Sequence, residues 1–237
     1  MKITLFDSRR HIKETEIIDK TVVVIDVLRT SATIITALQN GCRRIIPVSD
    51  VDEMVGVKKL AETGVLLCGD SGWDDLSGFD LGNSPAEYEK SIIDEKILAL
   101  YSVDGTRTIK RAENARNVIV GTFLNADAVA KKILEIGDDT YIICSGIKNE
   151  FALDDCIAAG CIISRVIDHD KSVKLEDFGE LAARYYISGK LDILRTIKLG
   201  EKAKRLIEAG FESDIEYCLQ EDVTDIVPVF KESTITL

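Results

Sequence analysis

Short apolar runs alternate with segments of helical spacing along most of the chain. The first run, "TVVVIDVL" at 21–28, is continuous except for one aspartate, which is typical of a strand buried on both faces in a parallel sheet. The next segment, "SATIITALQNG" at 31–41, predicts a helix with Thr30 or Ser31 as its N-cap and Gly41 just beyond its end. A strand followed directly by a helix is the repeating unit of α/β proteins.

The same alternation continues to the C-terminus. Further strands are predicted at 44–48, 65–69, 96–102, 117–122, 140–146 and 225–230. Helices are predicted at 49–64, 105–115, 125–137, 150–167, 175–189 and 200–210, and Ser84 with Pro85 predicts a short helix through Tyr88. This order of elements favours a three-layer α/β/α sandwich with a largely parallel or mixed central sheet.

No linker-like or low-complexity stretch divides these elements, so we expect residues 1–237 to form a single domain. One internal similarity is visible, because the segment that starts at Asp26 aligns without gaps on the segment that starts at Thr122. Two interpretations stay open. The similarity is either a pseudo-repeat near 21–48 and 117–144 left by a duplication, or only a shared strand–loop–helix–strand period.

The composition limits which binding partners and which cellular compartment are expected for this protein. A formal net charge of −11 argues against nucleic acid and against an anionic membrane, since both need a basic face. No apolar run is long enough to cross a bilayer, and the N-terminal segment lacks the apolar core of a signal peptide. The six cysteines form no CxxC pair and stand mostly in apolar runs, which indicates reduced core thiols in a cytoplasmic protein.

Histidine is scarce in this sequence. With only His11 and His169 present, neither a histidine-rich zinc site nor a histidine-centred triad is expected. The chemistry is therefore left to carboxylates, arginines, hydroxyls and backbone amides. In so acidic a chain, an anionic substrate also needs local positive charge from arginines, a helix N-terminus or a metal ion.

Polar residues gather at the carboxyl ends of the predicted strands, where open α/β sheets bind their ligands. They are Asp26, Arg29, Thr30 and Ser31 after the strand at 21–28, Asp70 after the strand at 65–69, Asp104, Thr106 and Arg107 after the strand at 96–102, and Ser145 and Gly146 after the strand at 140–146. We expect these loops to meet at one edge of the sheet and to form the functional site.

Asp26 stands in an apolar strand, where a carboxylate is costly unless it is paired, hydrogen-bonded or bound to a metal. It is either a structural residue satisfied by Arg29 or backbone amides, or a catalytic or metal-binding carboxylate. Asp154 and Asp155 lie side by side in an otherwise apolar helix and also allow two interpretations. They are either one solvated and one structural residue, or ligands for a hard cation such as Mg²⁺.

Two loops have the composition of an anion site. Arg107 follows Gly105 at a predicted helix start, where exposed amides and a guanidinium attract anions together. The loop "GNSP" likewise places the polar side chains of Asn83 and Ser84 beside a predicted helix start. Ordinary helix caps have similar sequences, so each loop by itself is also consistent with a structural turn.

Four segments taken together resemble the 2-phosphosulfolactate phosphatases. They are "VVVIDVLRTSATIITAL", "GFDLGNSPAEY", "DGTRTI" and "LDDCIAAG", and the match covers about residues 1–230. The resemblance implies a three-layer α/β/α fold and a Mg²⁺-dependent phosphatase of the coenzyme M pathway. Such an enzyme converts 2-phosphosulfolactate to 3-sulfolactate and phosphate.

The resemblance, together with the strand-end residues, implies roles for individual side chains. Mg²⁺ is expected on Asp26 and Asp70, with Asp154 or Asp155 as a further ligand. Asp26 and Arg29 are the expected catalytic residues. The expected substrate-binding residues are Thr30, Ser31, Asn83, Ser84, Thr106, Arg107, Ser145 and Gly146, with Asn83 and Ser84 on the carboxylate or sulfonate of the substrate.

The sequence departs from the family pattern at four of these positions or beside them. Asp70 and Asp154 stand where a glutamate is usual, Ser71 replaces an arginine, and Asp104 replaces an asparagine. Two alternatives therefore stay open. One is a phosphatase for another 2-hydroxycarboxylic acid phosphate ester, and the other is a non-catalytic anion-binding protein. The helical last third, with "AARYYISG", is also consistent with a homodimer interface.

Overall fold

The computed structural model describes residues 1–60, 64–70, 78–189 and 192–237. Its strands are β1 (Lys2–Phe6), β2 (Thr21–Ile25), β3 (Arg44–Val48), β4 (Val65–Gly69), β5 (Ile97–Tyr101), β6 (Asn117–Val120), β7 (Thr140–Cys144), β8 (Lys174–Leu175), β9 (Val229–Lys231) and β10 (Thr234–Thr236). Its helices are α1 (Thr30–Gln39), α2 (Val51–Leu60), α3 (Lys90–Ile93), α4 (Gly105–Arg111), α5 (Ala126–Ile136), α6 (Leu153–His169), α7 (Asp177–Gly189), α8 (Ile193–Ile197), α9 (Glu201–Glu208) and α10 (Glu212–Cys218), with a 3₁₀ turn η3 at Pro85–Glu87.

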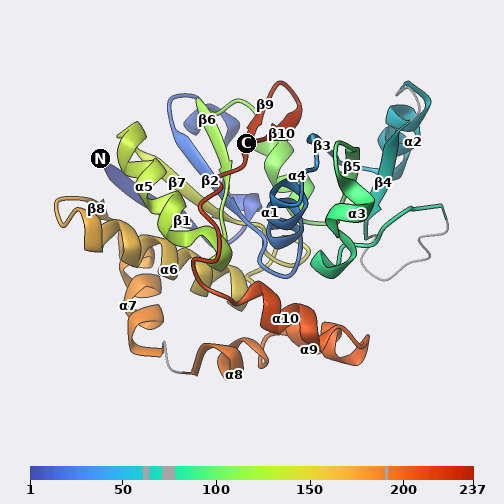
Figure 1. The fold of residues 1–237 in the computed structure, drawn as a ribbon. Helices are drawn as coiled ribbons and strands as arrows, with labels where there is room; N and C mark the ends of the chain where they lie inside the picture. The colour runs from blue at the N-terminus through green and yellow to red at the C-terminus, as the bar shows by residue number, and fades with distance from the viewer. Residues whose placement is uncertain (61–63, 71–77, 190–191) are drawn as a thin grey trace.

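The strands of the described residues form one mixed sheet in the order β4-β5-β3-β10-β9-β6-β2-β7-β1-β8 (Figure 1). Two blocks within it are parallel: β4-β5-β3 on one side and β6-β2-β7-β1-β8 on the other. The C-terminal hairpin of β9 and β10 joins the blocks through antiparallel pairs with β6 and β3. Parallel strands need long crossovers, which explains why helices separate most of them in sequence.

Strand β2 is buried on both faces because each face meets its own layer of helices. Val23 packs into the core beneath α5, α6 and α7, whereas Val22 and Val24 pack against α1 and the β3–β5 block. Side chains alternate between faces along a strand, so the continuous apolar run supplies both cores. This arrangement confirms the predicted α/β/α sandwich.

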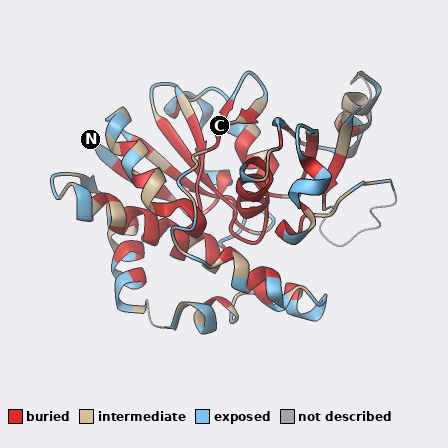
Figure 2. Cartoon of the chain, viewed as in Figure 1, coloured by how far each residue is buried: buried red, intermediate tan, exposed pale blue. Residues whose placement is uncertain are grey.

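Helix α1 lies inside the molecule and fixes the position of the site. Every residue from Thr30 to Leu38 is buried, and Figure 2 shows the helix as an unbroken buried segment. Ile34 and Leu38 contact apolar residues of both parallel blocks in one shared core. The helix ends at Gln39, and Gly41 follows two residues later with a φ of 96° that suits glycine. An enclosed helix cannot shift easily, so its N-terminus is held beside the end of β2.

The pattern-based predictions of the elements are largely confirmed. The strands at 44–48 and 65–69 have the predicted bounds, and those predicted at 21–28, 96–102, 117–122 and 140–146 are present but shorter. The strand predicted at 225–230 is displaced, because β9 spans Val229–Lys231. Strand β2 ends at Ile25, so Asp26 is the first residue after it. The strands β1, β8 and β10 and the helices α3, α8 and α10 were not predicted. The end of the predicted helix at 49–64 includes residues 61–63, which lie outside the described residues. The single domain and the duplication stay predictions.

Helix α7 packs on α6 at Gly160. A methyl group at this position would lie 2.2 Å from the carbonyl oxygen of Ala182 on α7. We therefore expect Gly160→Ala to lower the free energy of unfolding by about 1–3 kcal/mol, the usual cost of overpacking. Gly56→Ala on α2 is the matched control, since nothing lies within 4 Å of its added methyl group. Urea unfolding that ranks Gly160→Ala at or above the wild type would contradict the packing described here.

Candidate active site

A cavity of about 470 Å³ opens at the carboxyl ends of β2, β4, β5 and β7. Its lining comes from the loops after these strands and from the C-terminal helices. The lining residues are Asp26, Leu28, Arg29, Thr30, Asp70, Gly82, Asn83, Glu87, Ser102, Val103, Asp104, Ile147, Lys148, Lys202, Arg205, Leu206 and Phe211. The expectation that the strand-end loops meet at one place is therefore confirmed. The C-terminal helix α9 adds a wall that the sequence did not indicate.

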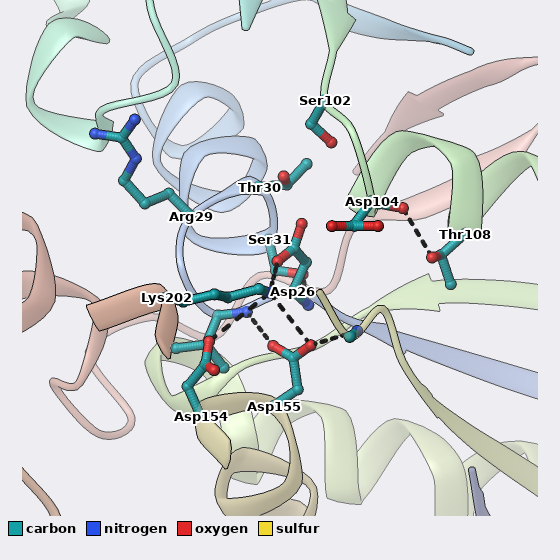
Figure 3. A network of polar contacts seen from close by, with 12 residues as sticks. Asp26, Arg29, Thr30, Ser31, Ser102, Asp104, Thr108, Asp154, Asp155 and Lys202 are labelled. Atoms are coloured by element: carbon teal, nitrogen blue, oxygen red, sulfur yellow. Dashed lines mark hydrogen bonds and ion pairs between the residues drawn. The ribbon is translucent and has the colours of Figure 1, made fainter. Parts of the chain in front are cut away.

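Lys202 of α9 reaches into a group of three buried carboxyl groups (Figure 3). Its Nζ lies 2.6 Å from Oδ1 of Asp26, 3.4 Å from Oδ2 of Asp155 and 3.9 Å from Oδ2 of Asp154. Asp26 lines the cavity, whereas Asp154 and Asp155 lie behind it in α6. Both members of the Asp154–Asp155 pair are buried, so neither is the solvated residue that one interpretation of the sequence proposed.

Asp155 joins three segments that are distant in sequence. Its Oδ1 accepts the amide of Val27 at 2.9 Å, and its Oδ2 accepts the amide of Gly146 at 2.9 Å. The carboxylate thus ties the loop after β2 to the loop after β7. A side chain also holds the backbone at Asp26, because the amide of Asp26 donates to Oγ of Ser31 at 2.9 Å. Ser31 and Gly146 therefore hold the backbone around the site and do not line the cavity.

The charges in this group are strongly perturbed. Burial alone would lower the pKa of Lys202, but the carboxylates of Asp155, Asp26 and Asp154 outweigh it and raise that pKa well above its usual value. Lys202 is thus an ammonium ion at neutral pH. Burial raises the pKa of both Asp154 and Asp155, more so for Asp155. Burial thus favours the protonated forms of Asp154 and Asp155, whereas a cation placed beside them favours the ionised forms.

Arg29 is held at the N-terminus of α1 by a second buried ion pair. Its Nη1 donates to Oδ2 of Asp214 at 2.7 Å, and its guanidinium lies over the ring of Phe211, 4.4 Å from the centroid. Nη2 lies 3.6 Å from Oδ2 of Asp70. Asp214 also accepts Oγ of Ser84 at 2.8 Å. Helix α10, which supplies Asp214, thus fixes the direction of Arg29 along the cavity wall.

The "GNSP" loop supports the cavity from the side of β4. Asn83 donates from Nδ2 to Oδ2 of Asp70 at 2.8 Å, and the same nitrogen lies 3.5 Å from Oγ1 of Thr30. Ser84 is buried and directed at Asp214. The predicted short helix is the 3₁₀ turn η3, with Ser84 as N-cap and Pro85 in its first turn. Asn83 lines the cavity, whereas Ser84 does not.

Thr106 and Arg107 lie outside the cavity lining. Thr106 exchanges hydrogen bonds with Ser102 at the start of α4, with its amide donating to Oγ of Ser102 at 3.0 Å. Arg107 donates from Nε to the carbonyl oxygen of Ser49 at 2.9 Å and packs near the ring of Tyr101. The structure thus directs this guanidinium to the β3–β5 block, away from the role expected for it. Ser145 is also buried outside the lining, and its Oγ receives no hydrogen bond.

Gly105 allows α4 to approach Asp26 closely. A methyl group here would lie 2.4 Å from Oδ2 of Asp26 and 2.6 Å from Cβ of Thr30. The neighbouring Asp104 is neutralised by a residue that the sequence did not single out. Oδ1 of Asp104 accepts Nη1 of the buried Arg9 at 2.7 Å, and its Oδ2 accepts the amide of Lys148 at 3.0 Å.

The residues present fit a hard cation in their chemistry. Oδ2 of Asp154 is buried and has no hydrogen-bond partner among the described residues, and three carboxyl groups lie around the ammonium of Lys202. Carboxylate oxygens are the protein ligands that Mg²⁺ prefers. No three His, Cys, Asp or Glu side chains of the described residues are yet arranged to hold a metal ion. The predicted ligand Asp70 belongs to a different group, since it contacts Asn83 and Arg29.

The functional residues that sequence reasoning missed are Lys202, Asp214, Arg9 and Lys148. Lys202 belongs to the predicted helix at 200–210, where a lysine beside an apolar stripe is an ordinary surface residue. Asp214 lies in a helix that was not predicted. No local pattern distinguishes either residue, because the first partner of each is distant in sequence: Asp26 lies 176 positions from Lys202, and Arg29 lies 185 positions from Asp214.

The cysteines offer no nucleophile at this site. All six are free thiols, and five of them are buried. Burial raises the pKa of Cys156 to about 12, although it is the least buried of them. A thiol with this pKa is almost entirely protonated at neutral pH. The expectation of core thiols without a catalytic role agrees with this placement.

Known proteins resemble the chain over nearly its whole length. The sequence pattern of the 2-phosphosulpholactate phosphatase family matches residues 6–233. A protein of Clostridium acetobutylicum named "Probable 2-phosphosulfolactate phosphatase" is 40% identical over 237 residues, which cover 99% of this chain and 100% of that protein. A Clostridium novyi protein of the same name is 38% identical over 236 residues and covers 100% of both chains.

The class of the protein follows from the site and these matches together. The catalytic apparatus of a phosphoric monoester hydrolase needs charged groups around a cavity, and the chain has both. The chain belongs to the 2-phosphosulpholactate phosphatase family. Among the described residues, no helix is both long and apolar enough to span a bilayer.

The pair of Arg29 and Asp214 gives a test of this description. Asp214→Ala leaves a buried guanidinium and Ser84 without their shared acceptor. We expect the free energy of unfolding to fall by about 3–5 kcal/mol, as for other broken buried pairs. Glu212→Ala on the same helix is the control, because its ion pair with Lys198 is exposed and should cost under about 1 kcal/mol. Equal stabilities of the two variants in urea would contradict a buried ion pair at Asp214.

Proposed function

We propose that the protein is a Mg²⁺-dependent phosphatase that hydrolyses 2-phosphosulfolactate to 3-sulfolactate and phosphate, a step of the coenzyme M biosynthesis type. The observation that carries this proposal is the cavity wall on which Asp26, paired with Lys202, lies beside Arg29 at the start of α1. The names of the Clostridium relatives support the same substrate. In the reaction, the bond between phosphorus and the ester oxygen breaks, and the oxygen of water adds to phosphorus.

The phosphoryl group binds where the cavity is most strongly charged. Arg29 and Lys202 supply two cations that are already fixed by buried carboxylates. Figure 3 shows Thr30 and Ser102 near Asp26, and all three residues line the cavity. Groups that are fixed before the substrate arrives lose little entropy on binding, and they stabilise charge that develops on the phosphoryl oxygens. Asp26 is the carboxylate of this wall that acts at the reacting phosphoryl group.

Asp26 and Asp154 are the residues that would hold Mg²⁺. Asp26 faces the cavity, and Asp154 has a buried oxygen atom without a hydrogen bond. A bound Mg²⁺ would supply Lewis-acid neutralisation of phosphoryl charge. Asp155 stays a supporting residue in this proposal, since both of its oxygens accept backbone amides. Asp70 orients Asn83 and Arg29.

Three further features of the proposal concern the surroundings of the enzyme. The substrate is a small anionic phosphate ester, and we propose no nucleic acid partner. We also propose a cytoplasmic protein, because all six cysteines are free thiols. A homodimer through α7 completes the proposal, since Leu181, Tyr185 and Ile187 are exposed apolar residues there.

Phosphate release tests the activity and the metal in one experiment. Purified protein is supplied with 2-phosphosulfolactate or with phospholactate, each in the presence of Mg²⁺ or of EDTA. We expect rapid release from 2-phosphosulfolactate with Mg²⁺ and loss of release with EDTA, because Mg²⁺ balances the excess carboxylates. Release from phospholactate alone would keep the reaction and change the substrate. No release from either ester by folded protein would refute the proposed activity.

Asp26→Asn tests the role of the central carboxylate. The amide keeps the shape of the side chain but removes its charge, so we expect the phosphatase rate to fall by about 100-fold or more. Asp19→Asn is the matched control, because Asp19 is an exposed partner of Arg116 and does not line the cavity. Thermal unfolding of both variants confirms that they are folded. Activity of Asp26→Asn within threefold of the wild type would remove Asp26 from the catalytic residues.

A further inference from the structure

The described residues of the cavity wall include equal numbers of cationic and anionic side chains, but these are not all paired with one another. The cationic residues of the lining are Arg29, Lys148, Lys202 and Arg205, and the anionic ones are Asp26, Asp70, Glu87 and Asp104. Which of these charges already have partners decides where a second anionic group of a ligand can bind.

Two of the four cations of the lining, Lys148 and Arg205, are not the partners of its carboxylates. Asp26 pairs with Lys202, and Asp70 accepts Asn83 beside Arg29. The negative charge of Asp104 is balanced from behind the wall by Arg9, which does not line the cavity. The remaining carboxylate, Glu87, accepts the amide of Gly82 at 2.7 Å. Each carboxylate therefore has partners that are independent of Lys148 and Arg205.

Lys148 and Arg205 carry positive charge that the wall does not neutralise. Lys148 is exposed, and no carboxylate of the described residues lies within ion-pair distance of its ammonium. Arg205 pairs with Glu201 one turn earlier on α9, a partly exposed pair of the kind that contributes little. Lys202, Arg205 and Leu206 line the cavity from the same face of α9. Both surplus cations are therefore available to a ligand.

The backbone around Lys148 forms a hydrogen-bonded turn. Ile147 and Glu150 exchange two backbone hydrogen bonds of 2.9 Å, which closes a two-residue turn over Lys148 and Asn149. Both residues of this turn have left-handed backbone, with φ of 51° and 68°, a conformation that favours asparagine and glycine. Lysine is unfavourable there, and the buried Asp104 secures it by accepting its amide. An unfavourable residue held by a buried partner beside a cavity indicates a functional position.

We propose that Lys148 and Arg205 form a subsite for the second anionic group of the substrate, a carboxylate or a sulfonate. The proposal rests on the phosphatase function proposed above, because that function supplies a ligand with a phosphoryl group at one end and an acid group at the other. Lys202 is held by Asp26 and Arg29 by the buried Asp214, and both cations serve the phosphoryl end. The acid subsite then replaces Asn83 and Ser84 in the role expected from the sequence, since both side chains are already bonded to carboxylates.

Binding of the product tests the subsite without turnover. Calorimetry measures the affinity of the protein for 3-sulfolactate, lactate and inorganic phosphate. The variants are Lys148→Asn, which suits the left-handed turn while removing the ammonium, and Arg205→Gln. The controls are Lys171→Asn in an exposed turn and Lys204→Gln, which is exposed on α9 next to Arg205. We expect both test variants to weaken 3-sulfolactate binding by about 10- to 100-fold, the effect of losing one hydrogen bond to a charged group. Their affinity for phosphate should change by less than threefold.

The outcomes separate this proposal from the proposed function. If the wild type binds 3-sulfolactate through Lys148 and Arg205 but releases no phosphate from the ester, the subsite stands and the activity falls. If the wild type hydrolyses the ester while the test variants bind 3-sulfolactate like the controls, the subsite is wrong. A wild type that does not bind 3-sulfolactate also overturns it. Lactate distinguishes the acid group, because equal weakening with lactate assigns the subsite to the carboxylate.

Discussion

The ion pair between Lys202 and Asp26 is the interaction on which the site depends. Three carboxyl groups lie buried at the end of β2 and the start of α6, and Lys202 is the ammonium placed among them. Taking such charges out of water costs several kcal/mol for each ion unless an opposite charge is close. The lysine comes from α9, some 176 positions along the chain from Asp26. The same contact that neutralises the carboxylates therefore also fixes α9 over the cavity and gives the site its outer wall.

A second buried pair repeats this arrangement on the other side of the cavity. Asp214 of α10 holds Arg29 and Ser84, and Arg29 in turn stands at the N-terminus of the enclosed helix α1. The two C-terminal helices are thus attached to the parallel sheet through charged side chains of the site itself. Fold and site share their residues here, since a change that frees Arg29 or Lys202 for another role also detaches a helix.

The sequence predicted those features that depend on local patterns. The apolar run of β2 is readable because both of its faces are buried, and the left-handed positions at Gly41 and Gly137 were marked by glycine at the ends of periodic segments. Strand β1 was missed because its segment has only five residues, although Ile3 and Leu5 alternate with Lys2 and Thr4 as in a half-buried strand. The direction in which an arginine side chain points could not be predicted from local patterns. Arg107 was expected in the cavity and Arg9 was not considered, yet tertiary packing turns Arg107 toward Ser49 and Arg9 toward Asp104.

The candidate carboxylates were predicted individually, but the cation that pairs with them could not be predicted, because no local rule relates residue 202 to residue 26. Residues 71–77, which include the departure at Ser71, lie outside the described residues.

An acidic chain can select an anionic ligand only through the local order of its charges. The net charge of −11 repels anions at long range, but this repulsion is screened by salt over about 10 Å. Inside the cavity, the balance of charge depends on which carboxylates are already neutralised.

Arg9 compensates Asp104 from behind the wall, so the position at which the family usually has an uncharged residue adds no net charge to the cavity. In the proposed function, the cations fixed by Asp26 and Asp214 bind the phosphoryl group, which is common to any phosphate ester. Discrimination among such esters then depends on the cations that the wall leaves uncompensated, at Lys148 and Arg205. The residues that determine which acid is bound are therefore expected at the rim of the cavity, and not in the buried carboxylate group.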